Sequence, residues 1–201
     1  CEGGFYGGHL GLHDKIKPIL KSATASFGIT ALNELEQLAH KKSLVEDGSF
    51  ALKTMEHINQ MVEKFKEEDG RLYAIYGTPA ENLCGLQVQQ FRKKHGVIEN
   101  VSDRDYVSNS FHCHVSEEIS PIEKQDKEKR FWDLCNGGKI QYVKYPIDYN
   151  MQAFKTLLKR AMRLGFYEGV NLSLSYCDDC GHEELNMDVL SLIHISEPTR
   201  H

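Results

Sequence analysis

The stretch "YAIYGTPAENL", residues 73–83, combines three signals that together indicate an α/β fold. The apolar and aromatic run that begins at Arg71 has the length of a strand, and Thr78-Pro79 turns the chain. Residues 80–94 then carry apolar side chains at helical spacing, which predicts a helix. A strand, a tight turn and a helix in this order are the repeating unit of α/β proteins.

The same turn is a candidate anion site. The free N–H groups of a first helical turn and the positive end of the helix dipole attract phosphate, and here they follow the end of a strand. Thr78 is a candidate N-cap, Pro79 suits the first helical position and Glu81 suits the first turn. An ordinary helix start explains the same residues, and on mechanics alone it is the simpler interpretation.

Other segments extend the alternation of strands and helices. Apolar residues at helical spacing predict helices over residues 27–40, 51–65 and 151–164. Asp47 or Ser49 is the candidate N-cap of the second helix, Asn150 caps the third, and Gly165 ends it. Strands are predicted in "YVSNSFHCHV" (106–115), "GGKIQYVKYP" (137–146) and residues 170–176. The rest of the polar stretch 96–133 is predicted to form loops.

Composition limits the class of protein. The chain has 201 residues, of which 40% are hydrophobic and 26% charged, as in a soluble globular domain. The net charge of −5 argues against nonspecific binding to nucleic acid or anionic lipid, because both favour clustered Lys and Arg. No apolar run is long enough to cross a bilayer and no signal segment stands at the start, so we expect a cytoplasmic protein.

Two of the six cysteines form a metal-binding pattern. Cys177 and Cys180 have the C-x2-C spacing of two zinc ligands on one tight turn, and the glycine that follows permits that turn. A redox pair is the weaker alternative, because such pairs lie at a helix N-terminus and this one precedes a polar stretch. The other four cysteines are predicted to be buried core residues: Cys1, Cys84, Cys113 and Cys135.

A third candidate is "NSFHCH", in which His112 and His114 would share one face of a strand and could share a metal or a substrate. Two histidines at this spacing are common by chance. A structural, hydrogen-bonding role is therefore the favoured interpretation.

Five stretches, taken in order, resemble the C-terminal third of an anaerobic, class III ribonucleoside-triphosphate reductase. They are "SATASFGITALNEL", "LYAIYGTPAENLCG", "YVSNSFHCHV", "NGGKIQYVKYP" and "YCDDCGHEELNMDV", and the resemblance runs from about residue 20 to Val189. It implies an α/β fold, a fragment of the ten-stranded glycyl-radical-enzyme barrel. Residues 1–170 would form the C-terminal part of this catalytic barrel. Residues 171–189 would form the first half of a zinc-ribbon-like four-cysteine site.

The resemblance also implies a reaction and its components. In that family a finger-loop cysteine, oxidised by a glycyl radical, abstracts the 3′ hydrogen of a ribonucleoside triphosphate, and a deoxyribonucleoside triphosphate results. A partner activase with an iron–sulfur cluster and S-adenosylmethionine installs the radical, and formate or a thiol system is the reductant. We expect a homodimer as the full-length protein, with zinc as a cofactor and neither a membrane nor nucleic acid as a partner. The finger-loop cysteine and the radical glycine are expected outside this chain.

The family's "STPAE" or "GTPAE" turn gives the predicted site residues. It places the substrate at Thr78, Pro79, Ala80, Glu81 and Asn82. Glu81 is the predicted catalytic residue, a carboxylate that takes part in proton transfer as the 2′-hydroxyl is lost. The resemblance thereby favours the phosphate interpretation of the turn over the ordinary helix start.

The last twelve positions, "LSLIHISEPTRH" at 190–201, match nothing in the family and resemble a translated cloning artefact. The family's second cysteine pair would follow Val189, so Cys177 and Cys180 are expected to be half of the zinc site. The chain alone is therefore expected to be inactive. Two alternatives are a zinc-ribbon-type binding module and a truncated fragment without an independent function.

Overall fold

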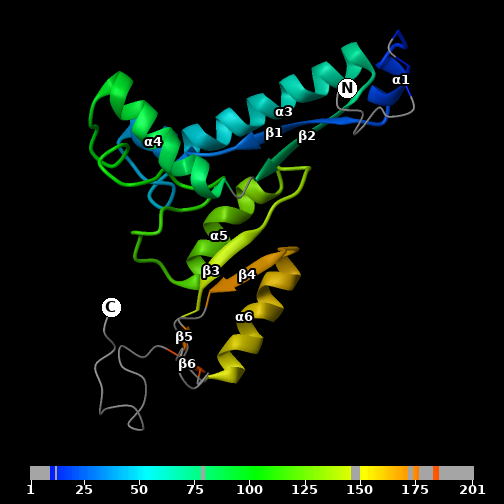
Figure 1. The fold of residues 1–201 in the computed structure, drawn as a ribbon. Coiled ribbons are helices and arrows are strands. Elements are labelled where there is room, and N and C mark those ends of the chain that lie inside the picture. The colour runs from blue at the N-terminus through cyan, green and yellow to red at the C-terminus, as the bar shows by residue number, and fades with distance from the viewer. Residues whose placement is uncertain are drawn as a thin grey trace. The chain divides into compact units, whose positions relative to one another are not determined.

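The computed structural model describes residues 10–11, 13–77, 80–145, 150–171, 174–176 and 183–185, with the backbone alone for Glu81 and the last two segments. Figure 1 shows helices and strands alternating along the chain. They are α1 (Lys17–Leu20), β1 (Thr24–Ile29), α2 (Leu32–His40), α3 (Ser49–Asp69), β2 (Leu72–Gly77), α4 (Glu81–His95), α5 (Pro121–Trp132), β3 (Gln141–Lys144), α6 (Met151–Leu164), β4 (Glu168–Asn171), β5 (Leu174–Tyr176) and β6 (Glu183–Leu185).

The chain divides into two compact units. Unit 1 comprises Cys1–Glu117 and Lys127–Lys139, and unit 2 comprises Glu118–Asp126 and Ile140–His201. Each described sheet has two strands, so the α/β class is confirmed, whereas no closed barrel is present among the described residues. In this part of the chain, no helix has the length and apolar character needed to span a membrane.

Unit 1 is built on the parallel pairing of β1 with β2. Ile29 is the partner of Gly77 at the end of the pair, and α3 packs against β2, as Figure 1 shows. The helix predicted over residues 27–40 is wrong at its start, because Phe27 to Ile29 belong to β1. The spacing of three that suggested a helix there is overridden by pairing with a strand that lies far away in the sequence.

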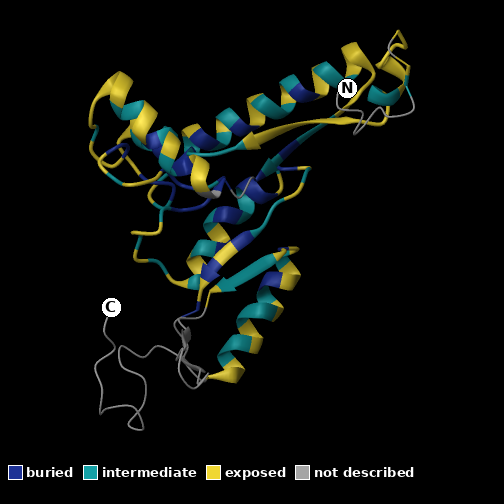
Figure 2. Cartoon of the chain, viewed as in Figure 1, coloured by how far each residue is buried: buried dark blue, intermediate teal, exposed yellow. Residues whose placement is uncertain are grey.

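The long helix α3 packs one apolar face against β2. Figure 2 shows buried residues recurring along it, as helical periodicity requires. The buried apolar side chains on and around α3 include Leu44, Met55, Val62 and Ile75. The predicted helix 51–65 is confirmed, but Gly48 is the N-cap, and Asp47 Oδ1 instead accepts a hydrogen bond from Ser49 N at 3.1 Å. Gly70, at φ 61°, ends the helix in the left-handed conformation.

Unit 2 contains a strand–helix–strand unit in which β3 and β4 are parallel and α6 lies between them in sequence. The bounds predicted for α6 are confirmed: Asn150 Oδ1 accepts from Ala153 N at 3.0 Å, and Gly165 stops the helix at φ 77°. The strand predicted over 170–176 is instead two strands. Residues 170 and 171 belong to β4, which pairs with β3, whereas β5 pairs antiparallel with β6.

The helix α5 lies in the stretch that was predicted to form loops. Its residues up to Asp126 belong to unit 2, and those from Lys127 belong to unit 1. Its buried positions include Gln125 and Glu128, both 0% exposed, so the apolar spacing that marks a helix is weak. Hydrogen bonds stabilise these polar side chains: within unit 2, Gln125 Nε2 donates to Glu168 at 3.0 Å.

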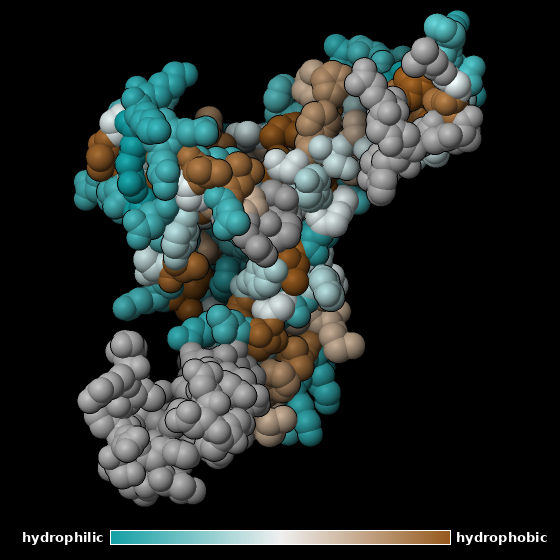
Figure 3. Space-filling view, in the orientation of Figure 1, coloured by the Kyte–Doolittle hydropathy of each residue, from teal (hydrophilic) through white to brown (hydrophobic). Residues whose placement is uncertain are grey.

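The predicted burial of the scattered cysteines is confirmed where they are described. Cys84, Cys113 and Cys135 are buried free thiols, and burial raises the pKa of Cys135 to about 11. A thiol with this pKa is protonated at neutral pH and is a poor nucleophile. Cys1, Cys177 and Cys180 lie outside the described residues. The face in Figure 3 mixes hydrophilic and hydrophobic side chains. The exposed hydrophobic residues of α4 include Leu83 and Leu86, which are 49% and 52% exposed.

We predict that Gly77→Ala destabilises the chain by about 1–3 kcal/mol, the usual cost of overpacking. A Cβ atom on Gly77 would lie 2.6 Å from Ser110 Oγ and 2.7 Å from Phe111 Cε1, both below contact distance. The matched control is Gly138→Ala, because a Cβ atom there meets nothing within 4 Å. Chemical denaturation of both variants measures the difference, and equal stabilities would contradict the close approach.

Candidate functional site

The carboxyl ends of β1 and β2 form the candidate site. Because the two strands are parallel and Ile29 pairs with Gly77, their ends meet at one edge. The helices α2 and α4 begin directly after these ends, at Leu32 and Glu81. Ligands of α/β proteins bind at such edges, where helix N-termini point toward them.

The start of α4 differs in detail from the prediction. Ala80, which is 7% exposed, occupies the N-cap position, and the helix begins at Glu81. Thr78 is therefore not the N-cap and Pro79 is not the first helical residue; both lie outside the described residues. Asn82 is exposed in the first turn of α4.

A side chain from another segment takes over the hydrogen bonding at this helix start. Asn109 Oδ1 accepts from Ala80 N at 2.7 Å and also lies 3.6 Å from the Sγ atom of Cys84. Asn109 accepts from the N–H of the N-cap residue itself, the bond that a Glu or Gln at the third helical position makes in a capping box. The beginning of α4 is thus fixed by a residue 29 positions along the chain.

The segment 107–111, "VSNSF", lies at the start of both helices. Ser108 O accepts from Ala31 N at 2.8 Å, and Val107 N donates to Cys84 O at 3.3 Å. The strand predicted over 106–115 is wrong, because these residues form irregular structure and turns rather than a sheet ladder. Ser110 has φ 48°, a left-handed conformation that a regular strand excludes.

The start of α2 is strained and tightly bonded. Its N-cap, Ala31, has φ 61°, a conformation that costs a non-glycine residue about 1 kcal/mol. Ala31 N–H is bonded to Ser108 O, and the next polar side chain, Asn33, is 1% exposed with its Oδ1 accepting from Leu44 N at 3.0 Å. These bonds hold the strained residue in place.

A buried carboxylate lies beside the same segment. Glu34 is 3% exposed, and its Oε1 accepts from Ser108 Oγ at 3.0 Å and lies 3.9 Å from Arg104 Nη1. Burial raises the pKa of Glu34, whereas its hydrogen bonds and Arg104 act in the opposite direction. The effect of burial is the larger one, so the pKa of this carboxyl group beside the strand edge is raised.

The two histidines of "NSFHCH" have separate partners. His112 Nδ1 lies 3.1 Å from Glu128 Oε2, and His114 Nδ1 lies 2.7 Å from Ser116 Oγ. Burial lowers the pKa of His114 to about 4, so its ring is neutral at pH 7. This geometry agrees with the structural role favoured for the pair.

Among the described residues, one group has side chains close enough to hold a metal ion: Glu36, His40 and Asp47. Their hydrogen bonds already have a structural purpose. Glu36 Oε2 accepts from Ala51 N at 2.8 Å, and Asp47 Oδ1 accepts from Ser49 N, so both carboxylates cap α3. His40 Nδ1 lies 2.6 Å from Glu36 Oε1 and connects the two.

Sequence reasoning missed Ser108, Asn109 and Glu34 as parts of this edge. The only signal that could have found Asn109 is its residue type, because Asn often bonds to backbone N–H groups near turns. Its partner, however, is set by the fold. Glu34 resembled an ordinary exposed helical residue, since its burial depends on the position of Arg104 and Ser108.

Comparison with known proteins gives a consistent result. The family model "Anaerobic ribonucleoside-triphosphate reductase" matches residues 2–188. The anaerobic ribonucleoside-triphosphate reductase of Haemophilus influenzae is 31% identical over 185 residues, which are 89% of this chain and 26% of that protein. The Escherichia coli reductase of the same name is 32% identical over 175 residues, 87% of this chain and 22% of that protein.

Solved structures show the same fold. The anaerobic ribonucleotide reductase from Thermotoga maritima, crystallised with dATP in its specificity site, matches with a TM-score of 0.65 at 19% identity. The match covers 82% of this chain and 28% of that one. This chain therefore spans about a quarter of the length of its relatives. Because the family model matches nearly the whole sequence, the chain belongs to the anaerobic ribonucleoside-triphosphate reductase family.

Proposed function

We propose that this chain forms part of the substrate site of an enzyme that reduces ribonucleoside triphosphates to deoxyribonucleoside triphosphates. The observation that carries the proposal is the position of the β2–α4 connection. It lies at the carboxyl edge of a parallel strand pair, within a chain that belongs to this reductase family. The complete enzyme would be a glycyl-radical barrel to which the described α/β elements contribute. Its radical chemistry requires residues that we expect outside this chain.

The substrate's triphosphate fits the start of α4. A first helical turn directs N–H groups away from the helix, and the helix dipole adds partial positive charge there. Ala80 N–H is engaged by Asn109, so the proposed phosphate contacts are the amides that follow it, from Glu81 and Asn82. With Thr78 and Pro79, these residues form the proposed binding turn.

Glu81 is the proposed acid–base residue. Loss of the 2′-hydroxyl as water requires a proton on the leaving oxygen, and a carboxylic acid at the substrate can deliver it and later be reprotonated. The first residue of α4 lies next to the proposed phosphate contacts, where such a group would reach the ribose. In this arrangement the chain binds and orients the substrate and moves one proton.

The C-terminal pairing fits a zinc knuckle. Tyr176 of β5 pairs with Glu183 of β6, which brings the two ends of the connecting segment together. Cys177 and Cys180 lie between these strands in sequence, as two ligands of one knuckle do. We propose that they hold half of a four-cysteine zinc site, whose metal would stabilise this end of the enzyme rather than take part in the reaction.

The proposal includes the family's partners. A radical S-adenosylmethionine activase with an iron–sulfur cluster would install the glycyl radical, and formate or a thiol system would supply the electrons. The full-length enzyme would be a cytoplasmic homodimer. The separate 201-residue chain would form no deoxynucleotide, because the radical-bearing residues would be absent.

We predict that Glu81→Gln, in a full-length reductase carrying this sequence, lowers kcat roughly a hundredfold or more, the usual contribution of a general acid. KM for the ribonucleoside triphosphate should change little, because the amide preserves the size and polarity of the side chain. Anaerobic assays with the activated enzyme measure both constants. A raised KM with unchanged kcat would instead assign Glu81 to binding.

Glu67→Gln is the matched control for this variant. Glu67 is exposed on α3, away from the strand edge, and undergoes the same chemical change. Both constants should stay within about twofold of the parent enzyme, since isolated surface substitutions are usually nearly neutral. A similar loss in both variants would show that the effect of Glu81→Gln is not specific.

We also predict that the 201-residue chain binds zinc weakly and loses it to a mild chelator, because two thiolates leave the metal half-coordinated. Replacing Cys177 and Cys180 by Ser should abolish the binding that remains. Titration against a colorimetric chelator measures the affinity. Stoichiometric zinc that survives the chelator would contradict the half-site.

A further inference from the structure

The segment 107–111 holds the side chain of Asn109 in a fixed place at the carboxyl ends of β1 and β2. Ser108 O accepts from Ala31 N at 2.8 Å on one side of Asn109. On the other side, the carbonyl oxygen of Asn109 accepts from His112 N at 2.9 Å. The backbone that carries the Asn109 side chain is therefore bonded both before and after it.

The side-chain amide of Asn109 has one orientation that its neighbours allow. Its Oδ1 lies 2.7 Å from Ala80 N, a group that can only donate. Oδ1 also lies 3.6 Å from Cys84 Sγ, and burial raises the pKa of this thiol, so it keeps its proton and is a second donor. Because both donors require the oxygen, the Nδ2 group must occupy the other branch of the amide.

The Nδ2 group of Asn109 carries two N–H donors that the described part of the chain does not use. No described residue accepts a hydrogen bond from it, whereas Oδ1 has both of its contacts. Asn109 is partly buried, and Nδ2 is not one of the unpaired side-chain atoms that are shielded from solvent. Its N–H groups are therefore accessible to water or to a ligand.

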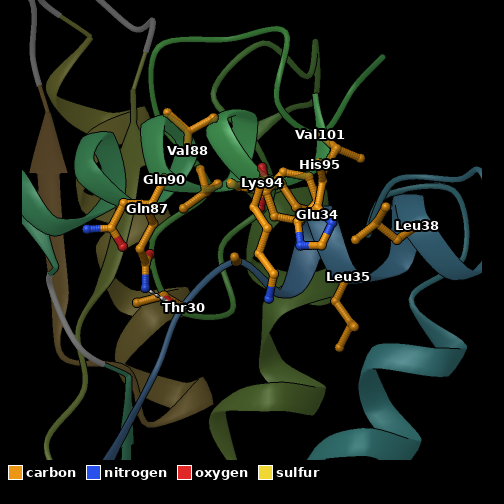
Figure 4. Close-up of a pocket in the computed structure, with 13 residues that line it drawn as sticks. Thr30, Glu34, Leu35, Leu38, Gln87, Val88, Gln90, Lys94, His95 and Val101 are labelled. Carbon is orange, nitrogen blue, oxygen red and sulfur yellow. Dashed lines mark hydrogen bonds between the residues drawn. The ribbon is translucent and has the colours of Figure 1, made fainter. Parts of the chain in front are cut away.

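Open space borders this segment. A cavity of about 520 Å³ lies between α2 and α4, and Thr30, Ala31 and Val107 line part of it. Figure 4 shows Thr30, the residue that follows β1, joined to Gln87 of α4, whose Nε2 donates to Thr30 Oγ1 at 3.1 Å. The end of β1 and the start of the segment 107–111 are thus not closed off by packed side chains.

The donors next to Asn109 Nδ2 indicate which kind of group it binds. Because Oδ1 of the same planar amide bonds to Ala80 N, Nδ2 lies beside the first turn of α4. The first bond within this helix runs from Cys84 N to Ala80 O at 3.0 Å, so the N–H groups of Glu81 and Asn82 have no partner inside the helix. Several N–H donors at the positive end of a helix dipole favour an anion with several oxygen atoms, such as a phosphate.

We propose that Asn109 is a substrate-binding residue whose Nδ2 donates a hydrogen bond to a phosphate oxygen of the ribonucleoside triphosphate. This inference rests on the function proposed above and adds to it a residue outside the binding turn. One planar group then has two tasks: Oδ1 fixes the start of α4, and Nδ2 binds the phosphate beside it. The amide is neutral, so it determines the direction of the phosphate while the helix end supplies the positive charge.

Asn109→Asp, in a full-length reductase carrying this sequence, separates the two tasks. The carboxylate keeps an acceptor for Ala80 N but replaces the N–H donors by an oxygen that repels phosphate. KM for CTP should rise at least tenfold, the loss expected for one hydrogen bond to a charged group, with kcat within about twofold of the parent value. A purely structural role predicts the parent KM in this variant, and that result would overturn the proposal.

Inorganic tripolyphosphate identifies the group that Asn109 binds, because it has the phosphates without the ribose or the base. Its inhibition constant against CTP should rise in Asn109→Asp by a factor similar to that of KM. An unchanged constant beside a raised KM would assign the donor to the ribose or the base and overturn the proposal. A parent enzyme that tripolyphosphate does not inhibit would overturn it as well.

Thermal unfolding shows that Asn109→Asp preserves the fold. Its midpoint should equal or exceed that of the parent, because Asp keeps the bond to Ala80 N and adds negative charge near a helix N-terminus. Asn109→Ser is a second variant that adds no charge and carries the test if the Asp variant does not fold. Its single short hydroxyl cannot serve both partners, so KM should again rise about tenfold, and a parent KM would contradict the proposal.

Asn100→Asp is the matched control. Asn100 is exposed beyond the C-terminal end of α4, and its Oδ1 also accepts a hydrogen bond, from Arg104 Nη2 at 3.4 Å. The same chemical change there should leave KM for CTP within about twofold of the parent value. An equal rise of KM in Asn100→Asp and Asn109→Asp would show a general effect of charge and overturn the proposal.

Glu81→Gln separates this inference from the proposed function on which it rests. If Glu81→Gln lowers kcat while both Asn109 variants keep the parent KM, the inference about Asn109 is wrong and the proposed function stands. If neither Glu81→Gln nor the Asn109 variants change the reduction of CTP, this strand edge is not the substrate site and both are wrong.

Discussion

Two hydrogen bonds made by neighbouring residues organise the candidate site. Ser108 O accepts from Ala31 N, and Asn109 Oδ1 accepts from Ala80 N. Ala31 and Ala80 are the N-caps of α2 and α4, and neither side chain can cap its own helix. One segment, residues 107–111, therefore fixes the start of both helices where β1 and β2 end. The direction of the helix N–H groups at this edge depends on the position of this segment.

Local signals made part of the fold predictable. The bounds of α6 follow from Asn150 and Gly165, because a side-chain cap and a left-handed glycine act within a few residues. The strand at Phe27 to Ile29 could not be found in this way, since its pairing with β2 is non-local. The helix α5 was missed for a different reason: Gln125 and Glu128 are buried by hydrogen bonding, which leaves no apolar pattern.

In the candidate site, too, the local features were predictable and the long-range contacts were not. The strand, turn and helix around Ala80 are local, so the sequence places Ala80 and Asn82 at a helix start correctly. The partner of Ala80 N–H is a side chain 29 residues away, and nothing near Ala80 indicates it. Residues 106–115 have the composition of a strand, but Asn109 bonds to Ala80 N and Ser110 lies in a turn at φ 48°. Composition alone cannot distinguish this arrangement from a sheet ladder.

Buried carboxylates, more than apolar contacts, select the loop geometry around this edge. Glu36 Oε2 accepts from the first turn of α3, Glu128 Oε1 accepts from Cys113 N, and Glu34 Oε1 accepts from Ser108 Oγ. A buried carboxylate is costly unless it is hydrogen-bonded, so each one disfavours any loop position that leaves it unpaired. Apolar packing supplies free energy without such direction. Within the described residues, Glu36 and Glu128 use both oxygens, whereas Glu34 Oε2 is buried without a hydrogen-bond partner.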